Sequence, residues 1–247
     1  MLNYVIVGGS NGIGLAIAKH LISIGNKVTI VDRNEPDKAA RLDNSNYTFI
    51  QTNLIFFDEN IFSDLAKDNN LGGLIITAGF GRVTDFENIS VKEINDMMAV
   101  NATACIKIIS LFYDRIRSNE PFYTAVMGSI AGLVSSPMFS VYAASKAAVC
   151  RFIESVNIEL EVKGTPNRIL NVSPGSIKGT KFNGGENDLS QTEELAADII
   201  DRMYKHETLF IPKYEETFKG VIERYQKDPH EYGLHSYEYK LNSGRVR

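Results

Sequence analysis

The stretch Tyr4-Val5-Ile6-Val7-Gly8-Gly9-Ser10-Asn11-Gly12-Ile13-Gly14 indicates how this chain of 247 residues folds. Its first four residues have the composition of a buried parallel strand, and an apolar helix that ends at Gly25 follows the glycines. A strand, a glycine turn and a helix N-terminus form an anion site, because backbone N–H groups and the helix dipole can approach a pyrophosphate where side chains would block it. The glycine spacing is not that of the GxGxxG fingerprint, so glycines that serve only a tight turn remain the alternative.

The second predicted strand, residues 27–31, places Asp32 at its carboxyl end. A carboxylate at this position can accept hydrogen bonds from a ribose diol and would repel a 2′-phosphate. Arg33 follows directly and could instead bind that phosphate. We therefore expect NAD rather than NADP as the cofactor, with a turn cap as the alternative role of Asp32.

Apolar runs and helical segments continue to alternate along the chain. Further strands are predicted at residues 47–52, 74–78, 122–127, 168–172 and 209–211. The pattern predicts an α/β fold: a doubly wound parallel sheet of about seven strands with helices on both faces. No repeat or linker divides the chain, so we expect a single domain over residues 1–247.

Small and polar residues follow several of these strands. Asn53 and Leu54 follow the third strand, Ala78 and Gly79 end the fourth, and Ser129 follows the fifth. Ligands in open parallel sheets bind outside the carboxyl ends of the strands. We therefore expect these positions to lie at one crevice.

The segment Ser140-Val141-Tyr142-Ala143-Ala144-Ser145-Lys146 is predicted to begin a helix, with Ser140 as the N-cap. Tyr142 and Lys146 then lie one turn apart on the same face. Lowering the pKa of a tyrosine from about 10 to about 7 requires roughly 4 kcal/mol. A cation about 4 Å away at an effective dielectric constant of about 20 supplies that amount. Taken alone, such a pair also occurs on ordinary helix surfaces.

Two segments of the form Ser-x-x-Glu predict helix starts. Ser90 to Glu93 is expected to open a long helix that carries Asn101, and Ser190 to Glu193 to open another. A buried amide such as Asn101 needs hydrogen-bond partners, and a satisfied core amide is the alternative to a catalytic role.

The polar, glycine-containing residues 182–190 are predicted to form a lid loop. Residues 213–247 are a C-terminal extension with a helix at 215–227, stopped by Asp228-Pro229. A tyrosine-rich run follows it. This extension is interpreted as a wall of the substrate pocket or a subunit contact, with a tail packed on its own surface as the alternative.

The composition excludes several classes of protein. A net charge of -4 gives no footprint for nucleic acid, and no signal peptide, membrane span or metal site is recognisable. Cys105 and Cys150 are expected to be buried free thiols, and His230 and His235 surface residues. We expect a cytoplasmic protein.

With these residues placed, the chain resembles the short-chain dehydrogenase/reductase family in its single-domain form, over about residues 3–211. The resemblance rests jointly on the glycine turn, on Asn101, on Ser129 followed thirteen residues later by Tyr142 with Lys146, and on Pro174-Gly175. It implies a Rossmann-type NAD(P)-dependent oxidoreductase that interconverts a secondary alcohol and a carbonyl.

The resemblance also implies a role for each of these residues. Tyr142 would be the general acid/base, and Lys146 would lower its pKa and bind the nicotinamide ribose. Ser129 would donate a hydrogen bond to the substrate oxygen, and Asn101 would hold a water that relays protons. The cofactor-binding residues would be Gly8, Ser10, Asn11, Gly12, Ile13, Gly14, Asp32, Arg33, Asn53, Leu54, Ala78, Gly79, Tyr142, Lys146, Pro174, Gly175, Ile177 and Thr180.

The chain departs from the family pattern at three places. Val7 replaces a threonine before the first glycine, so one side-chain bond in the turn should be missing. Ile76-Thr77-Ala78-Gly79 replaces Asn-Asn-Ala-Gly. Thr180 comes one residue later after Gly175 than the family's threonine, so the sequence does not determine whether it contacts the carboxamide of the nicotinamide.

The family forms dimers or tetramers through its long helices, which makes a homodimer or homotetramer the expected assembly. A non-catalytic dinucleotide sensor and a sugar-nucleotide epimerase or dehydratase are the alternative functions. The small-molecule carbonyl or alcohol substrate is not identified by the sequence.

Overall fold

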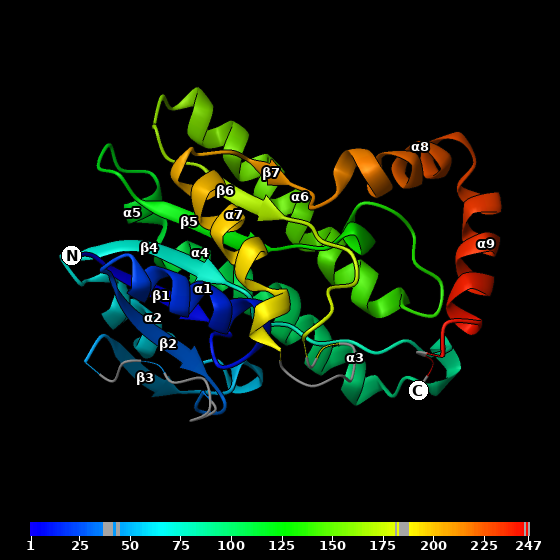
Figure 1. The fold of residues 1–247 in the computed structure, drawn as a ribbon, viewed down its shortest axis with the longest axis horizontal. Coiled ribbons are helices and arrows are strands. Elements are labelled where there is room, and N and C mark those ends of the chain that lie inside the picture. Colours follow the sequence, from blue (N-terminus) through cyan, green and yellow to red (C-terminus); the bar gives the residue numbers. More distant parts are fainter. Residues whose placement is uncertain (37–41, 43–44, 181, 183–187, 245, 247) are drawn as a thin grey trace.

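The computed structural model describes residues 1–36, 42, 45–180, 182, 188–244 and 246. Within them, one parallel sheet has the strand order β3-β2-β1-β4-β5-β6-β7 (Figure 1). The predicted doubly wound parallel sheet is therefore confirmed. The strands are β1 (Asn3–Val7), β2 (Lys27–Asp32), β3 (Tyr47–Gln51), β4 (Leu71–Ile76), β5 (Tyr123–Met127), β6 (Ile169–Val172) and β7 (Leu209–Phe210).

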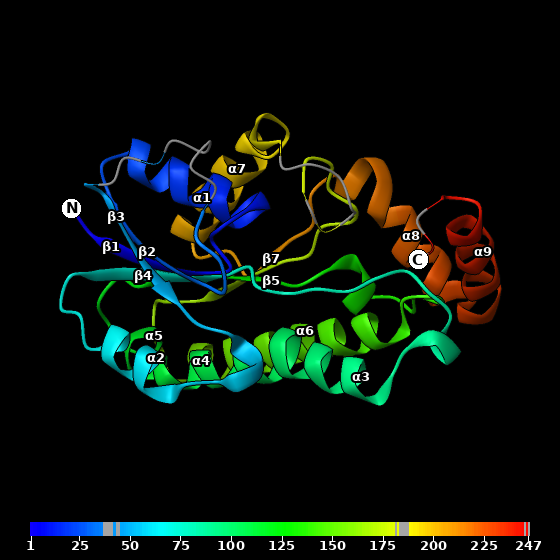
Figure 2. The ribbon, with the colours of Figure 1, turned by 90° about the horizontal axis from the view of Figure 1, so that it is seen from below.

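The helices are α1 (Gly12–Ser23), α2 (Glu59–Ala66), α3 (Val91–Met98), α4 (Ala104–Leu111), α5 (Tyr113–Ile116), α6 (Ser140–Val162), α7 (Glu193–Tyr204), α8 (Lys219–Lys227) and α9 (Pro229–Leu241). They cover both faces of the sheet, with α1 and α7 on one side and α2, α4, α5 and α6 on the other (Figure 2). The side chains of β1 alternate between the two layers: Val5 and Val7 belong to the core under α4 and α6, whereas Tyr4 and Ile6 belong to the core under α1 and α7.

The strand order creates a crevice at the carboxyl ends of the central strands. The chain leaves β1 toward β2 and β3 and then crosses back to β4, which pairs with the other side of β1. Helices connected to β1 and β4 therefore diverge to opposite faces, and the space outside the carboxyl ends of these strands stays open for a ligand.

Of the three predicted helix starts, the one at Ser90 is confirmed, and those at Ser140 and Ser190 are wrong. Ser90 caps α3 as expected, its hydroxyl accepting from the Glu93 N–H at 3.2 Å, but the Glu93 carboxylate binds Arg82 instead of closing the box. Ser140 is already helical, and the backbone of the preceding residue starts α6 without a side-chain cap. Ser190 lies in a 3₁₀ turn whose N–H groups are bound by Asp188, so α7 begins three residues later.

The helix that carries Asn101 is continuous from Val91 to Leu111, with a π-helical turn at Ala99–Thr103. It is long and apolar enough to cross a membrane by length and composition alone, a test that core helices of soluble proteins also pass. Its buried residues, such as Ile108 and Ile109, pack on the sheet in the main core. The expectation that no segment spans a membrane stays a prediction.

The C-terminal extension is more ordered than the sequence predicted. After β7 come a π-helical turn, α8 and α9, which lie at the end of the molecule where the strands terminate (Figure 1). Asp228 accepts from the N–H groups of His230 and Glu231 at 3.0 and 2.9 Å, and Pro229 occupies the first turn of α9. The Asp-Pro pair that was predicted to stop one helix therefore also starts the next.

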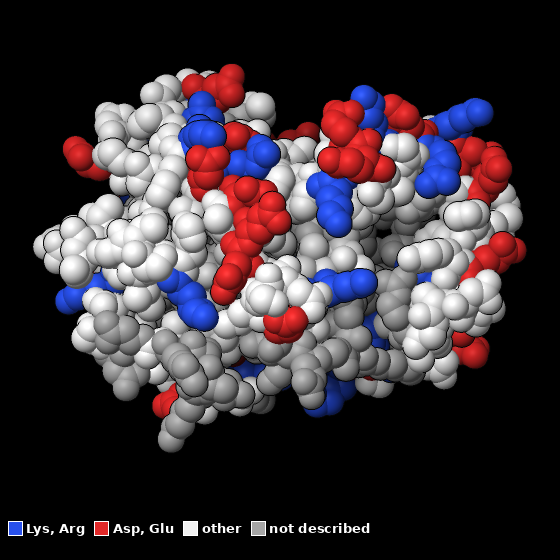
Figure 3. Space-filling model, viewed as in Figure 1, with Lys and Arg blue, Asp and Glu red and all other residues white. Residues whose placement is uncertain are grey.

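The remaining predictions concern the two cysteines, two histidines and the lid loop. Cys105 and Cys150 are buried free thiols, as predicted, and burial raises the pKa of Cys105 to about 12. His230 and His235 are exposed on α9. Acidic and basic side chains are interspersed over the face in Figure 3. Within the predicted lid, Phe182 and residues 188–190 are described, whereas residues 183–187, which include Gly184 and Gly185, lie outside the described residues.

Candidate active site

The glycine turn between β1 and α1 is shaped by close backbone approaches. Gly8 and Gly12 have φ angles of +90° and +54°, which side chains rarely tolerate. A Cβ at Gly14 would collide with the Gly8 carbonyl and the Thr77 hydroxyl. The sequence predicted that the turn lacks a side-chain hydrogen bond, because Val7 has no hydroxyl group. Thr77, which follows β4, supplies one instead by donating to the Gly8 carbonyl at 3.0 Å.

Asp32 has two roles at the end of β2. One carboxylate oxygen accepts from the Ser10 N–H at 3.1 Å, and the other accepts from the Arg33 N–H at 2.7 Å. The Ser10 hydroxyl donates to the Asn34 carbonyl. The turn-cap interpretation is therefore confirmed. Asp32 also lines the cavity described below, and its contact with a ribose stays a prediction.

A cavity of about 620 Å³ runs along the carboxyl ends of the central strands. That volume lies in the range of small-molecule and cofactor sites. Of the predicted cofactor residues, all but Ser10 line it; Ser10 is instead buried behind Asp32. The predicted lining residues are Gly8, Asn11, Gly12, Ile13, Gly14, Asp32, Arg33, Asn53, Leu54, Ala78, Gly79, Tyr142, Lys146, Pro174, Gly175, Ile177 and Thr180.

Ser129, Tyr142 and Lys146 lie together at one end of this cavity. Tyr142 and Lys146 project from the first two turns of α6, and the Lys146 ammonium lies 5.8 Å from the centre of the Tyr142 ring. Ser129 follows β5 and is hydrogen-bonded to Tyr142, while its hydroxyl also accepts from the Ala131 N–H at 3.1 Å. The sequence spacing thus brings a phenol, a hydroxyl and an ammonium group to one place.

The electrostatics of this group differ from the prediction. Burial raises the pKa of Tyr142 to about 12, and the hydrogen bond from Ser129 offsets only part of that effect. The Lys146 ammonium donates to the Met127 carbonyl at 2.7 Å, and burial lowers its pKa. The prediction that Lys146 brings the pKa of Tyr142 near neutrality is wrong for this structure, because the loss of solvation raises that pKa by more than the hydrogen bond from Ser129 lowers it. Tyr142 is therefore held as a protonated acid at neutral pH.

Asn101 lies in the π-helical turn and is buried next to Lys146. Its amide oxygen accepts from the Phe80 N–H at 2.9 Å, and its amide nitrogen donates to the Phe80 carbonyl at 2.8 Å and to the Ser145 hydroxyl at 3.0 Å. A Cβ at Gly79 would lie 3.2 Å from the Asn101 oxygen and 3.3 Å from the Lys146 nitrogen. Asn101 thus fixes the loop after β4 against Lys146.

The segment after β6 approaches the glycine turn. Thr180 is buried, donates to the Ile177 carbonyl at 3.0 Å, and would touch a Cβ at Gly12. Its late position in the sequence therefore does not remove it from the cavity. Gly175 packs against the Phe218 ring so closely that a Cβ would overlap it.

Sequence reasoning missed an aromatic wall and a lysine in the cavity. Phe139 stacks on Tyr142 with ring centres 4.2 Å apart, and Phe182 lies 5.3 Å from Tyr142. Lys240 of α9 also lines the cavity. Phe139 could have been noticed from its place beside the predicted helix start. A single lysine in a tyrosine-rich tail carried no signal.

Comparisons with known proteins agree with this geometry. A model of the short chain dehydrogenase family matches residues 3–191. An uncharacterized oxidoreductase of Saccharomyces cerevisiae is 27% identical over 186 residues, which cover 72% of this chain and 60% of the yeast protein. A 3-oxoacyl-[acyl-carrier-protein] reductase of Rickettsia prowazekii is 32% identical over 187 residues, covering 70% of this chain and 72% of the relative. The chain thus spans less than two thirds of the yeast relative.

A solved structure of a short-chain dehydrogenase from Sphingobium yanoikuyae in complex with NADPH is similar to this fold, with a TM-score of 0.72. It is 22% identical and covers 92% of this chain and 96% of that chain.

Sheet order, glycine turn and crevice define a dinucleotide-binding protein of the doubly wound class. Within that class, the chain belongs to the short-chain dehydrogenase/reductase family of oxidoreductases, whose cofactors are NAD and NADP.

The residues present fit such a cofactor. Side chains are absent from the glycine turn where a pyrophosphate would approach the backbone, and the cavity extends from Asp32 to Lys146. Among the described residues, no group of three or more His, Cys, Asp or Glu is placed to hold a metal ion.

Proposed function

We propose that this protein interconverts a secondary alcohol and a carbonyl with a nicotinamide cofactor, and that Tyr142 is the general acid/base. The observation that carries the proposal is the hydrogen bond between Ser129 and Tyr142 inside the same cavity as the glycine turn. When bound, the cofactor supplies or accepts the hydride at the reacting carbon. Every other requirement of the reaction falls to the side chains around it.

In the reduction direction, the Tyr142 hydroxyl gives its proton to the substrate oxygen as negative charge develops there. Ser129 donates a hydrogen bond to the same oxygen and so stabilises that charge. The Lys146 ammonium, one turn away, stabilises the phenolate that remains. Its bond to the Met127 carbonyl fixes its position, and the absence of a side chain at Gly79 leaves room for the ammonium group. The aromatic rings around Tyr142 exclude water from the reacting centre.

For the cofactor, we propose NAD in preference to NADP. The Asp32 carboxylate lies in the cavity wall and would repel a 2′-phosphate. We further propose a cytoplasmic homodimer or homotetramer. On α6, Ala144, Ala148, Ile158 and Val162 form an exposed small and apolar stripe that suits packing against a second copy. Sedimentation at micromolar concentration would measure the assembly.

The replacement Tyr142→Phe tests the proposed role. Proton transfer from a positioned group is typically worth about 10²- to 10⁴-fold, so turnover should fall by that range while the Kd for the reduced cofactor changes little. The measurement is NADH and NADPH consumption with a panel of carbonyl classes, and fluorescence titration of the cofactor.

Tyr4→Phe is the matched control, because Tyr4 is also buried and its hydroxyl is bonded to Tyr204 at 3.1 Å in the opposite core layer. Equal loss of turnover in both variants would contradict the assignment. Cofactor binding without turnover of any carbonyl would favour a sensor, and conversion of sugar nucleotides with no net change in NADH would favour an epimerase.

A further inference from the structure

The ring of Phe218 lies against the backbone of Gly175, in the segment that follows β6. A Cβ at Gly175 would lie 2.3, 3.0 and 3.2 Å from Cζ, Cε1 and Cε2 of that ring, and these are the three nearest atoms among the described residues. Gly175 is not among the described glycines that have a positive φ. The ring of Phe218, rather than the backbone conformation, therefore excludes a side chain at this position.

Gly175 lies at the catalytic end of the cavity. Just before it, the Pro174 carbonyl accepts from the Ile130 N–H at 3.0 Å, directly after Ser129. Pro174 and Gly175 line the cavity together with Tyr142. In hydride transfer the nicotinamide has to lie beside the reacting carbon, and so beside Ser129 and Tyr142. The backbone at Gly175 is thus placed to contact the nicotinamide half of a dinucleotide rather than its adenine half.

Phe218 approaches Gly175 from behind the cavity wall. It is half-buried in the π-helical turn Tyr214–Phe218, which opens the C-terminal extension, and it is not among the described residues that line the cavity. Its ring therefore fixes where the backbone of Gly175 lies without occupying the space of a ligand.

The turn that carries Phe218 is fixed at its start by β7. Lys213 has a φ of +58°, a left-handed conformation that is uncommon for a residue with a side chain, and its carbonyl accepts from the Phe218 N–H at 3.3 Å. The Ser173 N–H donates to the Phe210 carbonyl at 2.7 Å, which ties the segment after β6 to the end of β7. The ring and the backbone that it touches are therefore held by neighbouring strands.

The extension is also fixed at its far end. Helix α8 packs against α9 through two tyrosine rings whose centres are 5.5 Å apart. The buried Lys240 of α9 donates to the Ser136 hydroxyl at 2.7 Å and to the Pro137 carbonyl at 2.8 Å, in the loop before α6. Phe218 is thus held between β7 and two helices that are tied to the catalytic end of the molecule.

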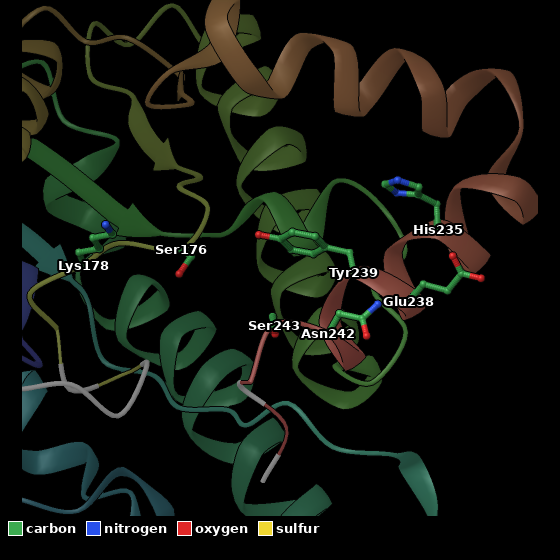
Figure 4. A pocket seen from close by; sticks show the side chains of 7 residues that line it. All are labelled: Ser176, Lys178, His235, Glu238, Tyr239, Asn242 and Ser243. Carbon is green, nitrogen blue, oxygen red and sulfur yellow. The ribbon is translucent and has the colours of Figure 1, made fainter.

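One residue beyond Gly175, the same segment borders a hollow of about 680 Å³ on the side of the extension. Figure 4 shows the Tyr239 ring extending from α9 toward Ser176 at this hollow. Phe218 lies against the segment one residue before the part that borders the hollow. Loss of its ring would leave an unfilled space behind Gly175 as well.

We propose that Phe218 is a positioning residue for the cofactor: its ring fixes the backbone of Gly175, and that backbone fixes the nicotinamide half. This inference rests on the proposed function, because it takes the cofactor to be a nicotinamide dinucleotide. A segment that is ordered before binding loses less conformational entropy when a ligand binds. Removal of the ring should therefore weaken the binding of ligands that carry a nicotinamide.

The experiment compares NADH with ADP-ribose by isothermal titration calorimetry of the full chain. ADP-ribose is the same dinucleotide without its nicotinamide, and neither ligand carries a 2′-phosphate, so the comparison does not depend on the choice between NAD and NADP. We expect Phe218→Ala to raise the Kd for NADH about tenfold and to leave the Kd for ADP-ribose within about twofold of wild type. Tyr214→Ala removes an exposed ring from the same turn and should change neither Kd.

A second pair of variants tests the contact itself. In Gly175→Ala the new methyl group would overlap the Phe218 ring, so the Kd for NADH should rise. Gly175→Ala combined with Phe218→Ala removes the overlap, and this double variant should bind NADH at least as tightly as Gly175→Ala alone. Independent effects of the two changes would instead multiply and give the weakest binding of all.

Equal changes in the two Kd values in Phe218→Ala, or multiplied effects in the double variant, would overturn the inference. If Phe218→Ala does not fold, Phe218→Leu keeps an apolar side chain without the ring and carries the same comparison. A selective loss of NADH affinity in a protein that turns over no carbonyl would support the role of Phe218 and count against the proposed reaction. Turnover of a carbonyl with no selective loss would have the opposite meaning.

Discussion

At the scale of single residues, the position of Tyr142 decides how its proton behaves. The spacing to Lys146 was readable from the sequence, because residues four apart share a helical face. The direction of the lysine was not, since it depends on the Met127 carbonyl at the end of a strand nineteen residues away. Burial of the phenol depends likewise on the Phe139 and Phe182 rings. Sequence therefore predicts which groups meet, and tertiary packing sets their pKa values.

The raised pKa of Tyr142 predicts how the rate depends on pH. With a pKa of about 12, the phenol stays protonated through the neutral range. Reduction needs the protonated form, so its kcat/KM should stay level from about pH 6 to about pH 9. Oxidation needs the phenolate, so its kcat/KM should rise by about tenfold per pH unit over the same range. Steady-state rates in both directions at saturating cofactor measure this. A fall in reduction centred near pH 7 would show instead that the pKa is lowered in the complex.

Asp32 predicts a linked change in cofactor preference and stability. Removing its charge with Asp32→Asn should raise the NADPH to NADH ratio of kcat/KM by about tenfold, because repulsion of the 2′-phosphate is lost. Asp32→Ala should do the same and also destabilise the fold by about 1 kcal/mol, because the N–H groups of Ser10 and Arg33 lose their acceptor. Kinetics with both cofactors and thermal unfolding measure the two effects. An unchanged ratio in both variants would leave Asp32 as a cap only.

At the scale of elements, the helix from Val91 to Leu111 shows what pattern reading can and cannot supply. Its start at Ser90 follows from the local preference for a hydroxyl N-cap. The π-helical turn that carries Asn101 has no such local signature, because it is stabilised by bonds to Phe80, twenty-one residues away. The same limit explains the wrong start for α7, because the Asp188 carboxylate accepts from both the N–H and the hydroxyl of Ser190, so Ser190 does not cap the helix.

Asn101→Ala should destabilise the protein measurably. It would leave the N–H and carbonyl of Phe80 without their amide partner, at a cost of about 1–3 kcal/mol for a buried group. For a chain of this length, a melting temperature lower by about 2–12 °C is expected. Calorimetry measures the shift, and Asn95→Ala, exposed on the same helix, should change it by less than about 2 °C. Equal shifts would mean that the Phe80 bonds contribute little.

At the scale of the whole molecule, the sheet was predictable because its strands are short apolar runs separated by helices, and a parallel order follows from that alternation. The predicted strand at residues 74–78 is the least accurate, since β4 begins at Leu71 and continues through two glycines that lie close to Leu2, Tyr4 and the Tyr123 carbonyl. The extension was underpredicted for a different reason. The segment after Pro229 has weak amphipathic character, and contacts made by Lys240 and Tyr237 hold it in place.

A chain that ends at Lys227, without α9, should keep its fold and cofactor site but lose much of the proposed activity toward carbonyls. Within the described part of the chain, the buried core clusters reach no further than Phe210, so the sheet and its helices do not depend on α9. Loss of Lys240 would release the loop at Ser136 and Pro137, next to Tyr142. Misplaced catalytic groups lower rates steeply, and we expect kcat/KM for carbonyls to fall at least tenfold, with the Kd for NADH within about threefold of wild type. A chain that ends at Asn242 keeps the Lys240 contacts and serves as the control. If both shortened chains were equally active, or if the shorter one no longer bound NADH, α9 would not have the role that its contacts assign to it.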